Sequence, residues 1–198
     1  MSNGRLVPLP PTAMDEAQRS LYDSILGGRR VGAPGRASGL THDDGSLVGP
    51  FDAFLRSPRI GTAMSNMGEA IRFDTTLPKN LLELGIIVVG RHWTAQFEWY
   101  AHSRMAVAAG VSEEAVAAIG RRETPTFDDP DEACVYRFAT ELVTGHRVTD
   151  ATYAEAVERL GEAHVYELTA AIGYYHAVSA VLNVFEVPLP AGVEPLQP

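Results

Sequence analysis

Residues 91–110 read RHWTAQFEWYAHSRMAVAAG, and the helical period of this run decides the fold expected for the chain. Phe97 and Met105 fall on one side of such a helix and predict a buried apolar face. Glu98 and His102 lie one residue along from that face and four residues apart, so their side chains can touch. The pair either joins two helices as an ordinary acid–histidine contact or handles protons inside a cavity.

Caps and helix breakers predict helices along most of the remaining chain. Ser57-Pro58 and Asp129-Pro130 each place a capping residue before a proline in the first turn. The expected helices are 12–26, 58–72, 78–91, the run ending at 110, one opening at 112, 130–145, 149–161 and 162–185. No run alternates in the manner of a strand, and no repeat divides the chain. We therefore expect an all-α, single-domain helical bundle over residues 1–198.

Two segments are expected to be irregular. Residues 27–50 are rich in glycine and proline, and loops of this length are usually functional lids or simply mobile. The arginines of this loop could meet a substrate carboxylate or could be ordinary solvated charges; they are Arg29, Arg30 and Arg36. Residues 188–198 predict an extended C-terminal tail, which in an oligomer could lie on a neighbouring subunit.

Composition excludes several classes of partner. A net charge of −9 and a pI near 5.1 count against nucleic acid and anionic membrane, because an acidic chain releases no counterions from phosphate. No apolar run reaches the length of a membrane span, and the N-terminus lacks the apolar core of a secretory signal. The single cysteine, Cys134, excludes an internal disulfide. We expect a cytoplasmic protein that binds neither nucleic acid nor membrane.

A second acid stands in an unusually apolar helix. Residues 79–91 read KNLLELGIIVVGR, and a helix that is apolar on nearly every side is buried in a bundle or at a subunit contact. Glu83 lies inside this run, where an isolated charge would be expensive. The carboxylate must therefore be paired, hydrogen-bonded or protonated, although near a helix start it could also be a plain capping acid.

Three segments together resemble a known superfamily. LLELGII around Glu83, EWYAH ending at His102, and AAGVSEEAVAAI after it follow the order and spacing of the carboxymuconolactone decarboxylase superfamily, with the histidine nineteen residues after the acid. The resemblance covers most of residues 46–190. It implies the alkylhydroperoxidase D-like helical fold and a homo-oligomer, usually a trimer or a hexamer.

One branch of that superfamily uses a Cys-x-x-Cys pair before the histidine. Here Ala95 and Glu98 stand at those two positions, so this chain resembles the longer members that lack the pair. A thiol peroxidase needs a thiolate and a resolving thiol, and Cys134 has no partner. The resemblance therefore implies that the protein is not a thiol peroxidase.

The resemblance also implies a chemistry. Family members decarboxylate a carboxymuconolactone without metal or organic cofactor, which suggests an anionic lactone or a cyclic ketone as the small-molecule substrate. His102 would be the general acid or base, Glu98 would orient the ring and tune its pKa, and Glu83 would be a second proton-handling carboxylate.

Several neighbours are candidates for substrate binding under that hypothesis. Trp93 and Phe97 would exclude water from the substrate. Arg91 or a loop arginine would hold an anionic group. On the last helix, His176 could face the same pocket, with Tyr175 or its neighbour Tyr174 as a hydroxyl donor.

Two other functional classes remain open. A metal site could use Glu83, Glu98 and His102, with His164 and Glu167 added, but the Glu-x-x-x-His spacing differs from the Glu-x-x-His of ferritin-like diiron proteins. No metal and no cofactor are therefore expected. The second alternative is a helical oligomer that binds a small molecule without catalysis.

Overall fold

The computed structural model describes residues 4–30 and 39–197, and within these ranges it holds eight α-helices and no β-strand beyond one isolated bridge. In chain order they are α1 (Glu16–Gly27), α2 (Pro50–Phe54), α3 (Pro58–Phe73), α4 (Lys79–His92), α5 (Gln96–Ala108), α6 (Glu113–Gly120), α7 (Pro130–Gly145) and α8 (Asp150–Val184). A short 3-10 turn, Pro11–Ala13, precedes α1. The all-α fold class is confirmed.

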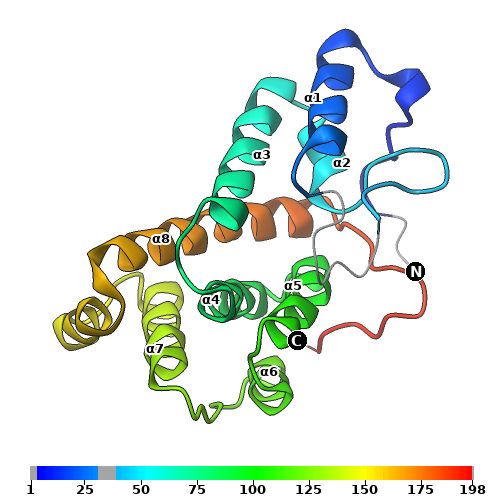
Figure 1. Ribbon diagram of the computed structural model, residues 1–198. Helices are drawn as coiled ribbons and strands as arrows, with labels where there is room; N and C mark the ends of the chain where they lie inside the picture. Colours follow the sequence, from blue (N-terminus) through cyan, green and yellow to red (C-terminus); the bar gives the residue numbers. More distant parts are fainter. Residues whose placement is uncertain (1–3, 31–38, 198) are drawn as a thin grey trace.

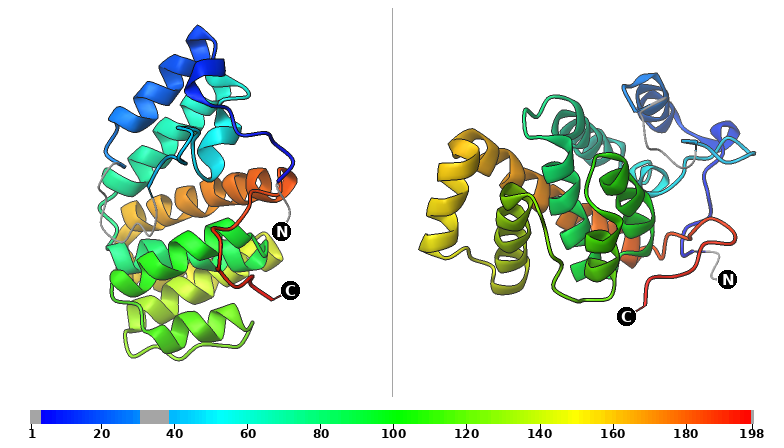
Figure 2. Two further views of the ribbon diagram at one scale, coloured as in Figure 1. Left: turned by 90° about the vertical axis from the view of Figure 1, so that its right-hand side faces the viewer. Right: turned by 60° about the horizontal axis from the view of Figure 1, so that its bottom comes forward.

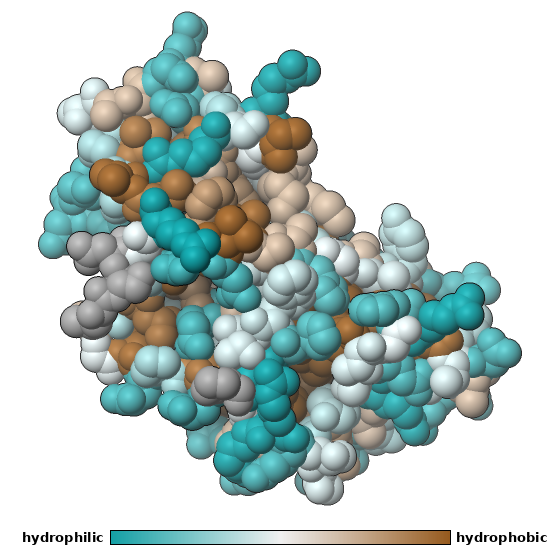
Figure 3. Space-filling view, turned by 180° about the vertical axis from the view of Figure 1, so that it is seen from behind, coloured by the Kyte–Doolittle hydropathy of each residue, from teal (hydrophilic) through white to brown (hydrophobic). Residues whose placement is uncertain are grey.

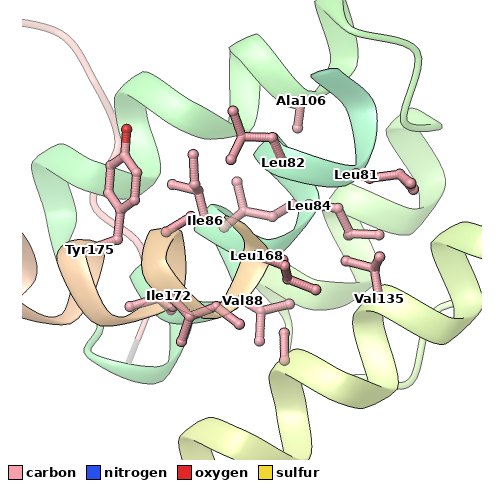
Figure 4. Packing of buried hydrophobic residues seen from close by; sticks show 14 of the residues in the cluster. Leu81, Leu82, Leu84, Ile86, Val88, Ala106, Val135, Leu168, Ile172 and Tyr175 are labelled. Atoms are coloured by element: carbon pink, nitrogen blue, oxygen red, sulfur yellow. The ribbon is translucent and has the colours of Figure 1, made fainter. Parts of the chain in front are cut away.

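Helix α4 forms the centre of the larger hydrophobic core. It is seen nearly end-on in Figure 1, with α5, α7 and α8 packed around it. All residues of α4 from Leu81 to Arg91 are buried, as its apolar sequence requires. Figure 4 shows Leu82 and Ile86 of α4 among side chains that include Leu168 and Ile172 of α8. This packing fixes α4 firmly, and with it the acid Glu83 that the helix carries.

Helices α1, α2 and α3 form a separate layer. Figure 2 shows them on one side of α8, whereas α4 to α7 lie on the other side. A second cluster of buried residues fills this layer: Leu21, Tyr22, Ile25, Leu40, Leu47, Phe51, Phe54 and Leu55. In the space-filling view of Figure 3, apolar atoms reach the surface mainly over this upper layer, and polar and charged atoms dominate elsewhere.

The structure corrects one helix boundary, adds one short helix and confirms one break. The helix expected from residue 12 begins at Glu16, where Asp15 and Gln18 form a capping box. Helix α2 was not expected, because its five residues are too few to show a period. Gly161 interrupts α8 as predicted: its φ of 82° and ψ of 158° are non-helical, and two helical segments meet there.

The two irregular segments are packed where the structure describes them. Residues 31–38, including Arg36, lie outside the described residues. Between residues 39 and 49 the chain carries an isolated bridge from Thr41 to Leu47, and Tyr22 donates a hydrogen bond of 2.9 Å to the Gly45 carbonyl. At the other end, Leu196 exchanges two hydrogen bonds with the side chain of Gln96, at 2.7 and 2.9 Å, which ties the tail to the start of α5.

Candidate active site

Helices α4 and α5 bring the three predicted catalytic residues together. Glu83 lies on α4, and Glu98 and His102 lie one turn apart on α5. All three side chains are buried, with exposed fractions of 3%, 3% and 8%. The sequence placed these groups in one neighbourhood, and the structure agrees with that placement.

His102 bridges the two acids. Its Nδ1 lies 2.6 Å from Oε2 of Glu83, a short hydrogen bond, and its Nε2 lies 3.1 Å from Oε1 of Glu98. The second contact lacks hydrogen-bond geometry, so Oε1 of Glu98 is buried without a hydrogen-bond partner among the described residues. The imidazole is therefore anchored by Glu83 and directed towards Glu98, and a small shift would complete the second bond.

Arg72 of α3 completes the group. Its Nη1 donates to Oε1 of Glu83 at 3.0 Å and to the hydroxyl of Tyr175 at 3.4 Å. Its Nη2 donates to the thioether sulfur of Met105 at 3.2 Å. Sulfur is a weak acceptor, so the guanidinium keeps hydrogen-bonding capacity for a better acceptor in the same space.

The two acids differ in their preferred protonation state. Burial opposes ionisation of Glu83, but His102 and Arg72 together outweigh burial and lower the pKa of this carboxyl. Burial dominates at Glu98 and raises its pKa, with His102 opposing the effect. Glu83 therefore favours the ionised form and accepts a hydrogen bond from Nδ1 of His102, whereas Glu98 keeps its proton to a higher pH than an exposed glutamate.

Tyr175 covers the imidazole. Its ring centroid lies 4.9 Å from that of His102, in an edge-to-face arrangement. Figure 4 shows Tyr175 projecting from α8, with its hydroxyl away from the helix. Burial raises the pKa of Tyr175 above its ordinary range, with Arg72 opposing, so the hydroxyl stays protonated.

A cavity of about 80 Å³ lies against this group. One water needs roughly 10–15 Å³ of such space, so the cavity can hold several waters or a small ring compound. His102, Glu98, Arg72 and Tyr175 face it. The apolar part of the wall includes Phe51, Phe97, Tyr100, Ala101, Met105 and Val178. The walls come from both layers of the fold and from α8.

Three residues expected to bind substrate lie elsewhere. Arg91, Trp93 and His176 do not line this cavity. Arg91 donates to the hydroxyl of Thr94 at 3.2 Å, and the half-exposed Trp93 donates its indole N–H to Nδ1 of His176 at 2.7 Å. Phe97 and Tyr175 do line it. The cause of the difference is the turn at Thr94, whose φ of 47° separates the end of α4 from α5.

Arg72 is the member of this buried group that the sequence analysis missed. It ends a helix eleven residues before Glu83, and arginine near a helix C-terminus is ordinarily explained by the helix dipole. The sequence signal for such a partner was Glu83 itself, because a carboxylate inside an apolar helix needs a partner such as a cation. Nothing local in the sequence identified which cation supplies it.

Membrane spans, metal-binding groups and the cysteine were compared with the expectations from the sequence over the described residues. They contain no helix long and apolar enough to cross a membrane. Within the same ranges, no three or more histidine, cysteine, aspartate or glutamate side chains form a group that could hold a metal ion. Cys134 is fully buried in the core, and burial raises the pKa of its thiol.

The fold and the site together define a class of protein. It is an all-α protein of the alkylhydroperoxidase D type, with an acid–histidine–acid group against a cavity. Residues 58–141 match the family model described as "Carboxymuconolactone decarboxylase family". This matched segment is similar to the family over the part of the chain that contains Arg72, Glu83, Glu98 and His102.

A solved structure shares the fold. The crystal structure of the debrominase Bmp8 in complex with 2,3,4-tribromopyrrole superposes with a TM-score of 0.63 and 17% sequence identity. The match covers 74% of this chain and 79% of that one. At this identity the likeness shows the fold alone. A comparison with curated proteins gave no match.

Proposed function

We propose that this protein is a cofactor-independent enzyme that transfers a proton at a carbon atom of a small carbonyl compound. The reaction is decarboxylation, or a proton shift in a lactone or cyclic ketone. The observation that supports it is the placement of His102, at the wall of a cavity, between two buried carboxyls whose pKa values are shifted in opposite directions. An ordinary acid–histidine pair at the surface would not require two buried acids whose pKa values are shifted in opposite directions.

Each residue has a part in the proposed reaction. In decarboxylation the bond to the carboxylate carbon breaks, carbon dioxide leaves, and the electron pair moves onto a conjugated carbonyl. Arg72 meets the oxyanion that develops, because its Nη2 otherwise contacts only sulfur. The pair of His102 and Glu98 then delivers one proton to carbon and regains it from water. Glu83 keeps the imidazole oriented through Nδ1.

The apolar wall supports the same reaction. A carboxylate that leaves as neutral carbon dioxide loses its charge, and a dry environment favours that loss. Phe97 and Val178 supply such an environment beside His102. The thiol chemistry of the peroxidase branch has no support at this cavity, since the single thiol, Cys134, is buried elsewhere.

The test is turnover of a panel of carboxylated muconolactones, β-keto acids and cyclic ketones, followed by carbon dioxide release and by NMR of the products. Wild type should turn over at least one compound, and His102→Gln should reduce its kcat/KM by about 100-fold or more, the usual contribution of a general acid. His42→Gln is the matched control, because His42 is exposed.

Two outcomes would contradict the proposal. One is full activity in His102→Gln. The other is tight binding of a panel compound by wild type with no turnover of any, which would instead favour a protein that only binds small molecules.

A further inference from the structure

The hydroxyl of Tyr174 has no hydrogen-bond partner among the described residues. Tyr174 lines the cavity and is only 6% exposed. The hydroxyl can therefore bond to a ligand or to water in the cavity. Burial also raises its pKa to about 12, so it remains an O–H donor at neutral pH.

Gly68 of α3 allows this hydroxyl to approach a second donor. A Cβ atom at Gly68 would lie 2.2 Å from Oη of Tyr174 and 3.1 Å from Nη2 of Arg30. Only a residue without a side chain fits between them. The absence of a Cβ thus brings the hydroxyl and the guanidinium close to one point on the cavity wall.

Arg30 keeps donors in reserve. Its Nη1 donates to Oγ of Ser65 and to Glu69, and its Nη2 donates to the Ser65 carbonyl at 2.6 Å. A guanidinium has five N–H donors, so Nε–H and one Nη2–H are left without a partner within the described ranges. Nε and Nη2 share one edge of the guanidinium, and such an edge pairs with the two oxygens of a carboxylate.

The charge on Arg30 is also poorly solvated. The residue is 4% exposed, and burial lowers its pKa, with Glu69 offsetting the loss only in part. A bound anion would offset the rest. A second ion pair at this position therefore gains both attraction and unused hydrogen bonds.

The geometry points to a carboxylate-binding subsite formed by Arg30 and Tyr174, on the wall of the cavity beside Gly68. This assigns the substrate class of the proposed function, on which it rests for calling the ligand a substrate: a small ring compound with a carboxylate that the product retains. In decarboxylation this carboxylate is not the one lost, because a group held by a guanidinium is stabilised in its charged form.

The aromatic rings near the subsite and near His102 limit the size of the ligand. Tyr175 contacts both Tyr174 and His102, with ring centroids 5.2 and 4.9 Å away. The ring centroids of Tyr174 and His102 are therefore at most about 10 Å apart. A five- or six-membered ring with an attached carboxylate fits within that span and within the cavity of about 80 Å³.

The test is an NMR binding titration with 2-furoate, and with neutral 2-furamide as the uncharged isostere. Wild type should bind 2-furoate at least tenfold more tightly than 2-furamide. Arg30→Gln and Tyr174→Phe should each weaken 2-furoate at least fivefold and leave 2-furamide within twofold. His102→Gln should keep its affinity for 2-furoate within threefold, which separates this subsite from the proposed chemistry.

Two matched controls guard against indirect effects. Tyr166→Phe removes a hydroxyl from an exposed tyrosine of the same helix and should not change binding. Gly68→Ala should abolish the preference for 2-furoate, whereas Gly173→Ala, where a Cβ meets open space, should preserve it. Thermal melts of each variant show whether Arg30→Gln still folds, and Tyr174→Phe and Gly68→Ala decide the question if it does not.

Three results would overturn the subsite. The first is equal affinity of wild type for 2-furoate and 2-furamide, or no binding of either. The second is unchanged 2-furoate affinity in Tyr174→Phe. The third is a loss that follows Arg72→Gln but not Arg30→Gln, which would move the anion to the other guanidinium.

Discussion

At the scale of single residues, Glu83 and Glu98 are two buried glutamates that both contact His102, and their pKa values shift in opposite directions. Guanidinium and imidazole lower the pKa of Glu83, whereas burial raises that of Glu98. Proton linkage therefore gives them opposite effects on stability as pH changes. Replacing each by glutamine separates the two effects, because the shape is nearly conserved while the charge is removed.

Glu98→Gln should gain stability over wild type as pH rises. The folded protein holds the Glu98 proton above the ordinary pKa of 4.5, so wild type loses free energy of unfolding as pH rises from about 4.5 towards the raised value. Glutamine has no such dependence. Urea denaturation of both proteins between about pH 4 and about pH 8 measures the difference, which should grow with pH.

Glu83→Gln should show the opposite trend. Ionised Glu83 stabilises the fold above pH 4.5, and that stabilisation is lost as pH falls through its lowered pKa. At neutral pH the variant should be less stable by roughly 3 kcal/mol, the low end for breaking a buried pair, since the Arg72 side chain is 18% exposed. The deficit should shrink in acid. Parallel trends in the two variants would contradict the assigned protonation states.

The residues of the site were predictable to different degrees. Glu98 and His102 are one helical turn apart, and Glu83 stands out in an apolar helix, so local patterns identified all three. Tyr174 and Tyr175 were candidates for the same pocket, and both line the cavity. Arg72 reaches the cavity from another helix, and no local period reports such a distant contact. Arg91 and Trp93 were misleading neighbours of His102 in sequence, because the turn at Thr94 separates them from the cavity.

At the scale of helices, the N-terminal layer depends on a close approach at Gly61. A Cβ atom there would lie 2.3 Å from the Phe54 carbonyl oxygen and 2.8 Å from Cδ2 of Leu21. The first of these atoms belongs to backbone and cannot rotate away. Helices α1, α2 and α3 therefore meet at a point where only glycine fits.

Gly61→Ala should destabilise the protein by about 1–3 kcal/mol, the usual cost of overpacking, in spite of the higher helix propensity of alanine. Gly27→Ala is the matched control, since a Cβ there meets nothing within 4 Å and should leave stability nearly unchanged. Urea denaturation measures both. Wild-type stability in Gly61→Ala would show that these three helices can shift apart at little cost.

Helix boundaries were predictable where a cap or a breaker stands alone. Ser57 before Pro58, and Asp129 before Pro130, marked α3 and α7 correctly. The start of α1 was wrong, because Thr12 and Asp15 are both capable caps and only Asp15 has Gln18 at the position that closes a capping box. Helix α2 is too short to leave a periodic signal.

At the scale of the whole molecule, apolar side chains remain exposed on α3 and on α8. Ile60 and Met67 of α3 are 65% and 43% exposed, and Tyr166 of α8 is 76% exposed. We expect a homotrimer or homohexamer, as the superfamily resemblance implies. Light scattering after size-exclusion chromatography should give three or six times 21.4 kDa. A mass of one chain at micromolar concentration would contradict this expectation.

The all-α architecture could be predicted from the sequence, but the position of the cavity could not. Periodicity and caps define helices one at a time, whereas the cavity lies where Phe51 and Gly68 of the N-terminal layer meet His102 of α5 and Val178 of α8. That meeting depends on packing between residues more than 100 positions apart. Only the three-dimensional structure supplies it.

The burial of His102 and Glu98 also affects how much of a deuterium label the product would retain. Where the proposed reaction is a proton shift, a hydrogen removed from one substrate carbon resides on His102 or Glu98, which are 8% and 3% exposed. We expect such a hydrogen to return to carbon faster than it exchanges with the medium. A deuterium at the reacting position would then be retained in part at the second carbon of the same molecule.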